Sequence, residues 1–222
     1  MAILHHYPLH PSSRFARLQF GEYGIEVSLH TRVPWDVTSE LLALNPAGSL
    51  PVFEDEDEGC VPGARVMCEW IEDVYEGAYL MPSSAAERAE VRRIIDWFEV
   101  KFASEVSEPL FRERVFKHFE KNQPISSQNL RQAISNAHVH MGYINFLAGQ
   151  EAWLAGRTIS LADMAAAAHL SVLDYFGDIK WDDFPDAKTW YMKMKSRPAF
   201  RPLLADVVVG LAPSSHYAVI DF

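Results

Sequence analysis

Residues 43–53 read ALNPAGSLPVF and place a proline at the first position of a short apolar strand predicted over residues 51–53. Proline has no backbone N–H to give to a strand ladder, so Pro51 must begin the strand rather than lie inside it. A cis Leu50–Pro51 bond in a tight turn would expose the backbone N–H and C=O of Leu50 to a ligand. An ordinary trans turn is the alternative, because most X–Pro bonds are trans. The stretch therefore predicts a tight turn followed by a buried strand.

Strands and helices alternate on both sides of this turn. Gly24 ends the first helix, because a glycine adopts the left-handed cap conformation without steric cost. Residues 25–30 alternate apolar and polar side chains, the pattern of a half-buried strand. In the last helix of this half, Val66, Ile71 and Val74 are expected to face the core. The predicted order is βαβ, helix, ββα, with strands at residues 2–7, 25–30, 51–53 and 59–61 and helices at residues 14–23, 38–44 and 65–75.

The second half of the chain is predicted to be helical. The short segment MPSS at residues 81–84 breaks the pattern, and apolar residues then recur at three- and four-residue steps. Residues 159–164, ISLADM, form a capping box in which Ser160 and Asp163 each satisfy an amide at the helix start. The helix that follows is apolar nearly all round, so it is expected at the centre of a bundle. The expected divisions are an α/β domain over residues 1–80, a linker over 81–85, an all-α domain over 86–206 and a tail over 207–222.

Composition excludes several classes of function. The formal net charge is −10, and residues 1–80 alone hold 13 acidic and 4 basic residues, which disfavours nucleic-acid binding. No apolar run is long enough to span a membrane. Cys60 and Cys68 are too few for a disulfide scaffold, so a reducing cytoplasm is expected. No histidine pair has the spacing of a metal site, and no metal ligand is predicted.

Three segments together carry a resemblance to a known family. Residues 42–53, LALNPAGSLPVF, resemble the loop before strand three in the cytosolic glutathione transferase superfamily, including its cis-proline at Pro51. Residues 158–170 resemble its capping-box helix, and residues 184–200 resemble its last core helix. The resemblance covers roughly residues 2–205. It implies the glutathione transferase (GST) fold, a thioredoxin-like domain packed on a helical bundle, usually as a homodimer.

The resemblance also implies a glutathione site, of which this chain keeps only part. Members of the superfamily hold the γ-glutamyl end of glutathione with a Glu-Ser or Gln-Ser pair at the start of helix three. The segment EWIE at residues 69–72 sets the register and places Gly63 and Ala64 at that pair. Neither residue has a side chain that could bond to glutathione. Leu50, Pro51, Gly63 and Ala64 are therefore interpreted as the relic of a glutathione site.

The position that activates the thiol in the superfamily has several candidates. If the chain is an active transferase, Tyr7, Ser12 or Ser13 would hydrogen-bond to the glutathione thiolate and lower its pKa. The serines could equally be helix caps, and Tyr7 a half-buried residue at a strand end. His10 occupies a plausible position for the catalytic hydroxyl, but neutral imidazole is a poorer donor to a thiolate. None of these is a strong catalytic signal.

Within the superfamily, the departure at Gly63 and Ala64, the start HHYPLHPSSRFARLQ at residues 5–19 and the tail resemble transferase-like proteins of bacterial cell division that bind the tubulin-like ring protein FtsZ. That likeness implies a non-catalytic homodimer that organises FtsZ filaments at the division site and needs no cofactor. The alternative is a glutathione transferase that conjugates glutathione to small electrophiles.

The segment at residues 207–222 ends in a group of apolar and aromatic residues. Packing of this tail over its own fold is the favoured interpretation. The alternative is a partner anchor, since exposed aromatic and aliphatic side chains mark interaction sites. The residues of that anchor would be Tyr217, Val219, Ile220, Asp221 and Phe222.

Overall fold

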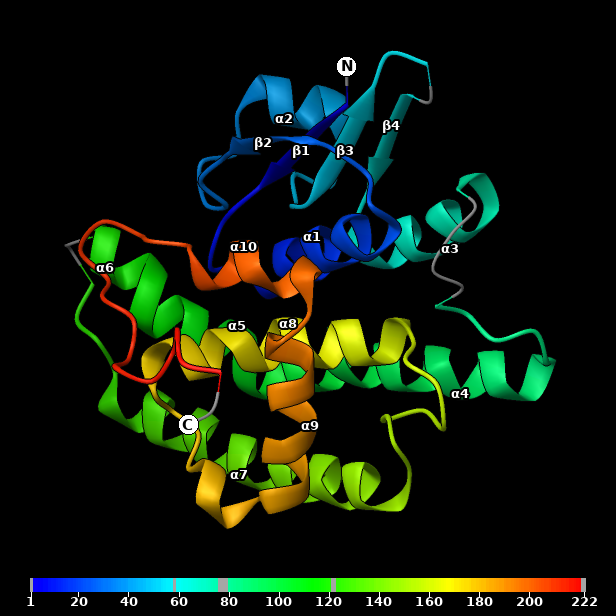
Figure 1. Ribbon diagram of the computed structural model, residues 1–222. Coiled ribbons are helices and arrows are strands. Elements are labelled where there is room, and N and C mark those ends of the chain that lie inside the picture. Colours follow the sequence, from blue (N-terminus) through cyan, green and yellow to red (C-terminus); the bar gives the residue numbers. More distant parts are fainter. Residues whose placement is uncertain (1, 58, 76–79, 121–122, 221–222) are drawn as a thin grey trace.

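The computed structural model describes residues 2–57, 59–75, 80–120 and 123–220. A small sheet with its helices forms the first half of the chain and a helical bundle the second. Helix α1 (Pro11–Tyr23) lies between them (Figure 1). Asp221 and Phe222, two residues of the predicted anchor, lie outside the described residues.

The sheet has four strands in the order β2-β1-β3-β4. Strands β1 and β2 are parallel, while β3 is antiparallel to both β1 and β4. The predicted βαβ, helix, ββα order is confirmed. Its elements are β1 (Ile3–His6), α1, β2 (Ser28–Thr31), α2 (Ser39–Leu44), β3 (Val52–Asp55), β4 (Gly59–Pro62) and α3 (Ala64–Val74).

Local chemistry sets the ends of these elements. Pro11 stands at the start of α1, where its missing N–H costs no helical hydrogen bond. Gly24 ends α1 with a φ of 67°, the left-handed cap that its position predicts. Thr38 caps α2 by accepting a hydrogen bond from the backbone N–H of Leu41.

Two expectations about this half are wrong. The strand predicted over residues 25–30 lies at Ser28–Thr31, whose four residues are exposed, whereas the half-buried Ile25 and Val27 precede it and pack against the core. Val66 and Val74 are exposed, whereas Ile71 is buried as expected. The buried stripe of α3 consists of Ala64, Met67, Cys68 and Ile71, whose three- and four-residue spacing leaves both valines on other faces.

The second half is helical, as predicted. Between α4 and α7 the chain runs through segments that include two π-helical stretches, η1 and η2. The elements are α4 (Ala85–Asp96), η1 (Trp97–Ser107), α5 (Glu108–Phe111), η2 (Arg112–Phe116), α6 (Lys117–Phe119), α7 (Ser127–Gln150), α8 (Leu161–Phe176), η3 (Trp181–Asp183), α9 (Pro185–Lys195), η4 (Pro198–Phe200) and α10 (Arg201–Leu204). No helix among the described residues is both long and apolar enough to cross a membrane.

Helix α8 is the centre of the bundle, and its residues from Leu161 to Tyr175 are all buried. The capping box predicted at its start is present. The Asp163 carboxylate accepts hydrogen bonds from the backbone N–H of Ser160, at 2.9 Å, and from that of Leu154, at 3.0 Å. It also accepts one from the indole N–H of Trp190, at 2.8 Å, so one buried carboxylate joins three segments of the bundle.

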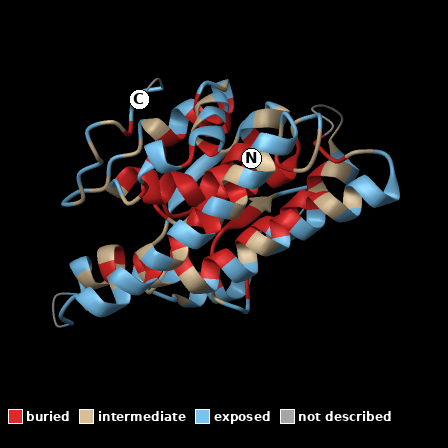
Figure 2. Cartoon of the chain, turned by 90° about the horizontal axis from the view of Figure 1, so that it is seen from below, coloured by how far each residue is buried: buried red, intermediate tan, exposed pale blue. Residues whose placement is uncertain are grey.

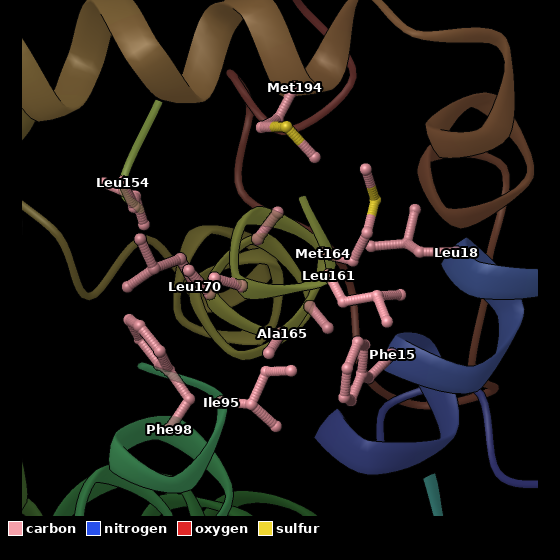
Figure 3. Packing of buried hydrophobic residues seen from close by; sticks show 14 of the residues in the cluster. Phe15, Leu18, Ile95, Phe98, Leu154, Leu161, Met164, Ala165, Leu170 and Met194 are labelled. Atoms are coloured by element: carbon pink, nitrogen blue, oxygen red, sulfur yellow. The ribbon is translucent and has the colours of Figure 1, made fainter. Parts of the chain in front are cut away.

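The two halves share one hydrophobic core (Figure 2). Phe15 and Leu18 of α1 lie against Leu161 and Ala165 of α8, with Ile95 of α4 close by (Figure 3). The run of alanines at residues 165–168 is fully buried, and such small side chains let neighbouring helices approach closely. The shared core fixes the position of the sheet half against the bundle. A cavity lies at the same contact, and residues of both halves line it.

Candidate functional site

A cavity of about 380 Å³ lies where the loops of the sheet half meet the bundle. Its walls come from the start of α1, the turn before β3, the start of α3, the segment from η1 to α5, and α8. The lining residues are His10, Pro11, Ser12, Ser49, Leu50, Gly63, Ala64, Arg65, Val66, Glu99, Ala103, Ser107, Glu108, Phe111 and His169. The structure therefore brings Leu50, Gly63, Ala64 and Ser12 together, although they are far apart in sequence.

The turn before β3 is tightly held. The Leu50–Pro51 bond is cis, which is the geometry expected from the sequence. The Asn45 side chain donates to the carbonyl of Ser49 at 2.9 Å and accepts from the backbone N–H of Ala47 at 3.1 Å. Gly48 has a φ of 64°, and a Cβ there would lie 2.8 Å from a methyl carbon of Val37. Pro51 does not line the cavity, but its carbonyl accepts a hydrogen bond from the N–H of Gly63.

The start of α3 has no side-chain cap. Gly63 is the N-cap residue with a φ of 86°, and neither it nor Ala64 carries a polar side chain. The first amides of a helix have no intrahelical acceptor, so this wall of the cavity presents backbone N–H groups. Arg65 adds a guanidinium to the same wall, but it pairs with Asp96 at 2.7 Å. The wall thus keeps its helix dipole and lacks the polar pair of a γ-glutamyl site.

Tyr7 and Ser13 do not line the cavity. The Tyr7 ring is buried edge-on against Trp35 and Phe111, and burial raises the pKa of its hydroxyl to about 12. Ser13 is fully buried and accepts a hydrogen bond from the backbone N–H of Tyr7 at 3.2 Å. Both side chains therefore serve the packing of the junction between β1 and α1.

Ser12 and His10 do line the cavity. The Ser12 hydroxyl hydrogen-bonds to the carboxylate of Glu99. Burial lowers the pKa of His10 to about 4, so its imidazole is neutral at pH 7. Neither side chain provides the charged or strongly polarised donor that would stabilise a thiolate.

Among the polar lining residues that the sequence analysis did not foresee, Glu99, Ser107 and His169 form one hydrogen-bonded group. His169 Nε2 lies 2.8 Å from a carboxylate oxygen of Glu99, and His169 Nδ1 lies 2.8 Å from the hydroxyl of Ser107. Burial by itself raises the pKa of the Glu99 carboxyl, but hydrogen bonds from His169 and Ser12 outweigh it and hold the pKa below its usual value. The signal in the sequence was His169, a polar residue inside an otherwise apolar helix. A buried polar group needs a hydrogen-bond partner, so its presence there indicates polar neighbours on another segment.

The tail packs on its own chain at Tyr217. This side chain is only 1% exposed, and its hydroxyl accepts from the Arg14 guanidinium at 2.8 Å and donates to the Leu203 carbonyl at 2.9 Å. Tyr217 is therefore not an exposed anchor. Val219 and Ile220 are 45% and 39% exposed.

Within the described ranges, no group of three His, Cys, Asp or Glu side chains is arranged to hold a metal ion.

Comparison with known families agrees with this geometry. Residues 4–78 match the model of the glutathione S-transferase N-terminal domain, and residues 109–198 match that of the glutathione S-transferase C-terminal domain. The chain is also 45% identical to FtsZ-localized protein A of Caulobacter vibrioides, over 99% of this chain and 97% of the relative. The chain belongs to the glutathione S-transferase superfamily. This superfamily member lacks the Glu-Ser or Gln-Ser pair at the start of α3.

Solved structures extend the likeness to the whole fold. FzlA from C. crescentus has a TM-score of 0.95 and 44% identity, covering 100% of this chain and 99% of that one. A glutathione S-transferase from Sinorhizobium meliloti 1021 has the same TM-score and identity and covers 100% of both chains. The sheet and bundle described above are thus the GST fold throughout.

Proposed function

We propose that this member of the glutathione S-transferase superfamily is a binding protein that associates with FtsZ filaments in bacterial cell division. The observation that carries the proposal is the 45% identity to FtsZ-localized protein A over nearly the full length of both chains. We further propose that it acts as a homodimer, because a two-fold dimer presents each binding patch twice and can bridge two filaments. Its place in the cell would then be the division site.

The cavity supports a role that does not depend on glutathione conjugation. Conjugation requires a stabilised thiolate, whereas the ionised Glu99 carboxylate would repel one. The missing polar pair at Gly63 and Ala64 would weaken glutathione binding by about 1–3 kcal/mol for each lost contact. No cofactor is required by this proposal.

Co-sedimentation with polymerised FtsZ tests the proposal directly. The chain is expected in the pellet with FtsZ filaments and in the supernatant when FtsZ is kept unpolymerised. Light scattering coupled to gel filtration tests the dimer in the same preparation. Equal recovery in the pellet with and without filaments would contradict the proposal.

A glutathione transferase remains the second candidate, for two reasons. The cis Leu50–Pro51 turn keeps the backbone of Leu50 on the cavity, and one of the most similar solved structures carries the name glutathione S-transferase. A glutathione column separates the two candidates. The binding-protein proposal expects no specific retention, while elution by free glutathione together with turnover of a chlorinated aromatic substrate would favour the transferase.

A further inference from the structure

Ser107, His169 and Glu99 form a continuous hydrogen-bonded chain on the wall of the cavity. Glu99 and Ser107 belong to the π-helical segment η1, and His169 reaches them from the central helix α8. Both links are 2.8 Å long. π-helical segments are uncommon in proteins and occur often at functional sites.

The rules of hydrogen bonding limit which protons these three groups can carry. An ionised carboxylate can only accept hydrogen bonds, so the Nε2 of His169 must carry the proton that faces Glu99. A neutral ring that donates from Nε2 has an acceptor at Nδ1, and this is the form in which the Ser107 hydroxyl donates to the imidazole. A serine hydroxyl donating to an imidazole, which in turn donates to a carboxylate, is the arrangement that activates a serine nucleophile.

Aromatic rings and a further hydrogen bond surround this arrangement. The rings of Phe98 and Phe102 pack against the imidazole of His169, with centroids 5.9 and 5.7 Å away. Ser12 hydrogen-bonds to the Glu99 carboxylate and fixes its orientation. Ser107 and His169 are 2% and 1% exposed, yet both line the cavity, so a substrate would meet them only inside it.

We propose that this cavity hydrolyses small uncharged carboxylic esters, with Ser107 as nucleophile, His169 as general base and Glu99 as the residue that positions His169. In the first step Ser107 Oγ bonds to the carbonyl carbon as its proton passes to His169 Nδ1. The ester C–O bond then breaks, and His169 returns that proton to the leaving alcohol. Water attacks the acyl-serine, gives its proton to His169, and releases the acid as Ser107 regains its own proton. The uncapped amides at the start of α3 line the same cavity and supply donors for the developing oxyanion.

The walls indicate the class of substrate. Leu50, Val66, Ala103 and Phe111 give the cavity apolar surface, and its volume of about 380 Å³ suits a small molecule. The carboxylates of Glu99 and Glu108 on the same walls disfavour an anionic acyl group. The activity needs no glutathione and is separate from filament binding.

A fluorophosphonate probe tests the nucleophile on the intact chain, because Ser107 would displace fluoride and keep the phosphorus covalently. Mass spectrometry of the treated protein is expected to find the adduct on Ser107. Hydrolysis of p-nitrophenyl acetate is expected to fall on the order of 10²–10⁴-fold in Ser107→Ala. The matched control is Ser104→Ala, since Ser104 is an exposed serine of the same segment whose hydroxyl donates to the carbonyl of Lys101.

Separate measurement of kcat and KM in Glu99 variants tests the role of Glu99. In Glu99→Gln we expect kcat for p-nitrophenyl acetate to fall about 100-fold with KM unchanged, and Glu99→Asp to recover part of the loss. The proposal is overturned if no adduct forms on Ser107, if the adduct forms on Ser12 or Ser49 instead, or if Ser107→Ala hydrolyses the ester at the normal rate. Because labelling uses the unmutated chain, it decides the matter even if Ser107→Ala fails to fold.

Discussion

At the scale of single residues, the buried carboxylate of Asp163 contributes more than its place in a capping box indicates. It accepts hydrogen bonds from Leu154, Ser160 and Trp190, so its removal leaves several buried donors without a partner. Burial raises the pKa of its carboxyl, and those donors act in the opposite direction. Each donor left unpaired in the core costs about 1–3 kcal/mol.

We therefore expect Asp163→Ala to lower the free energy of unfolding by roughly 3 kcal/mol or more. Ser160→Ala removes only the hydroxyl half of the box and is expected to cost about 0.5–2 kcal/mol. Urea unfolding followed by circular dichroism measures both. Equal losses in the two variants would mean that the contacts of Asp163 to Leu154 and Trp190 add nothing.

A second residue-scale prediction concerns pH. Burial lowers the pKa of His6 to about 3, and the charges of Arg17 and Arg14 act in the same direction. Below a pH of about 6.5 the unfolded chain binds this proton and the folded chain does not, so stability falls as the pH drops from there towards 3. At pH 5 the loss from His6 is roughly 2 kcal/mol relative to pH 7. In His6→Gln the difference in unfolding free energy between pH 7 and pH 5 is expected to shrink by that amount; an unchanged difference would show that His6 is not the group responsible.

At the scale of elements, one buried aromatic side chain of the tail, Tyr217, packs into the fold. Tyr217 belongs to a satellite core with Tyr7 and Leu41 from the sheet half and Val115 and Tyr175 from the bundle. The tail before it is held by backbone and side-chain bonds, since Ser214 donates to the carbonyls of Tyr175 and Asp174. The tail is therefore fixed to both halves at Tyr217, while Val207 and Val209 before it and Val219 and Ile220 after it are exposed.

A chain that ends at Ser215 is expected to melt several degrees lower, because it loses the buried Tyr217 and leaves the Arg14 guanidinium without that partner. The matched variant Ile220→Ser changes an exposed side chain and should leave the melting temperature within about a degree. If the exposed residues Val219 and Ile220 anchor a partner, Ile220→Ser should weaken co-sedimentation with FtsZ without affecting stability. An unchanged melting temperature of the shortened chain would show that Tyr217 does not hold the two halves together.

At the scale of the whole molecule, the two halves are joined by a large shared contact. They share a core, and ion pairs cross between them, with Arg17 to Asp206 at 2.7 Å and Arg197 to Glu22 at 2.6 Å. Helix α1 packs against α8 throughout this contact (Figure 1). If the sheet half were separated from the bundle, the face of α1 that packs on α8 would be exposed to water.

We expect a single unfolding transition, with coincident midpoints for tryptophan fluorescence and far-ultraviolet circular dichroism. Phe15→Ala, at the contact between α1 and α8, should lower the unfolding free energy by about 3–5 kcal/mol and shift both probes together. Exposed Val139→Ala on α7 serves as the control. Two separated transitions would show that the halves fold independently.

The sequence by itself determined the elements and the family. Periodicity, the glycine after α1, the capping box at Ser160 and Asp163 and the proline at position 51 are local signals, since each depends on residues near it in the chain. They were enough to predict the sheet half, the bundle and the central buried helix. They also predicted that the start of α3, at Gly63 and Ala64, carries no polar side chain, because the register along one helix is a local property.

Only the tertiary structure decided which side chains share the cavity. Ser12, Glu99, Ser107 and His169 lie on three separate segments, and their hydrogen bonds exist only once α1, η1 and α8 have packed together. The same packing buries Tyr217, whose partner Arg14 is about two hundred residues away in sequence. A local pattern records which residues favour a helix or a strand, but a side chain's burial and partners are set by the segments that pack on it.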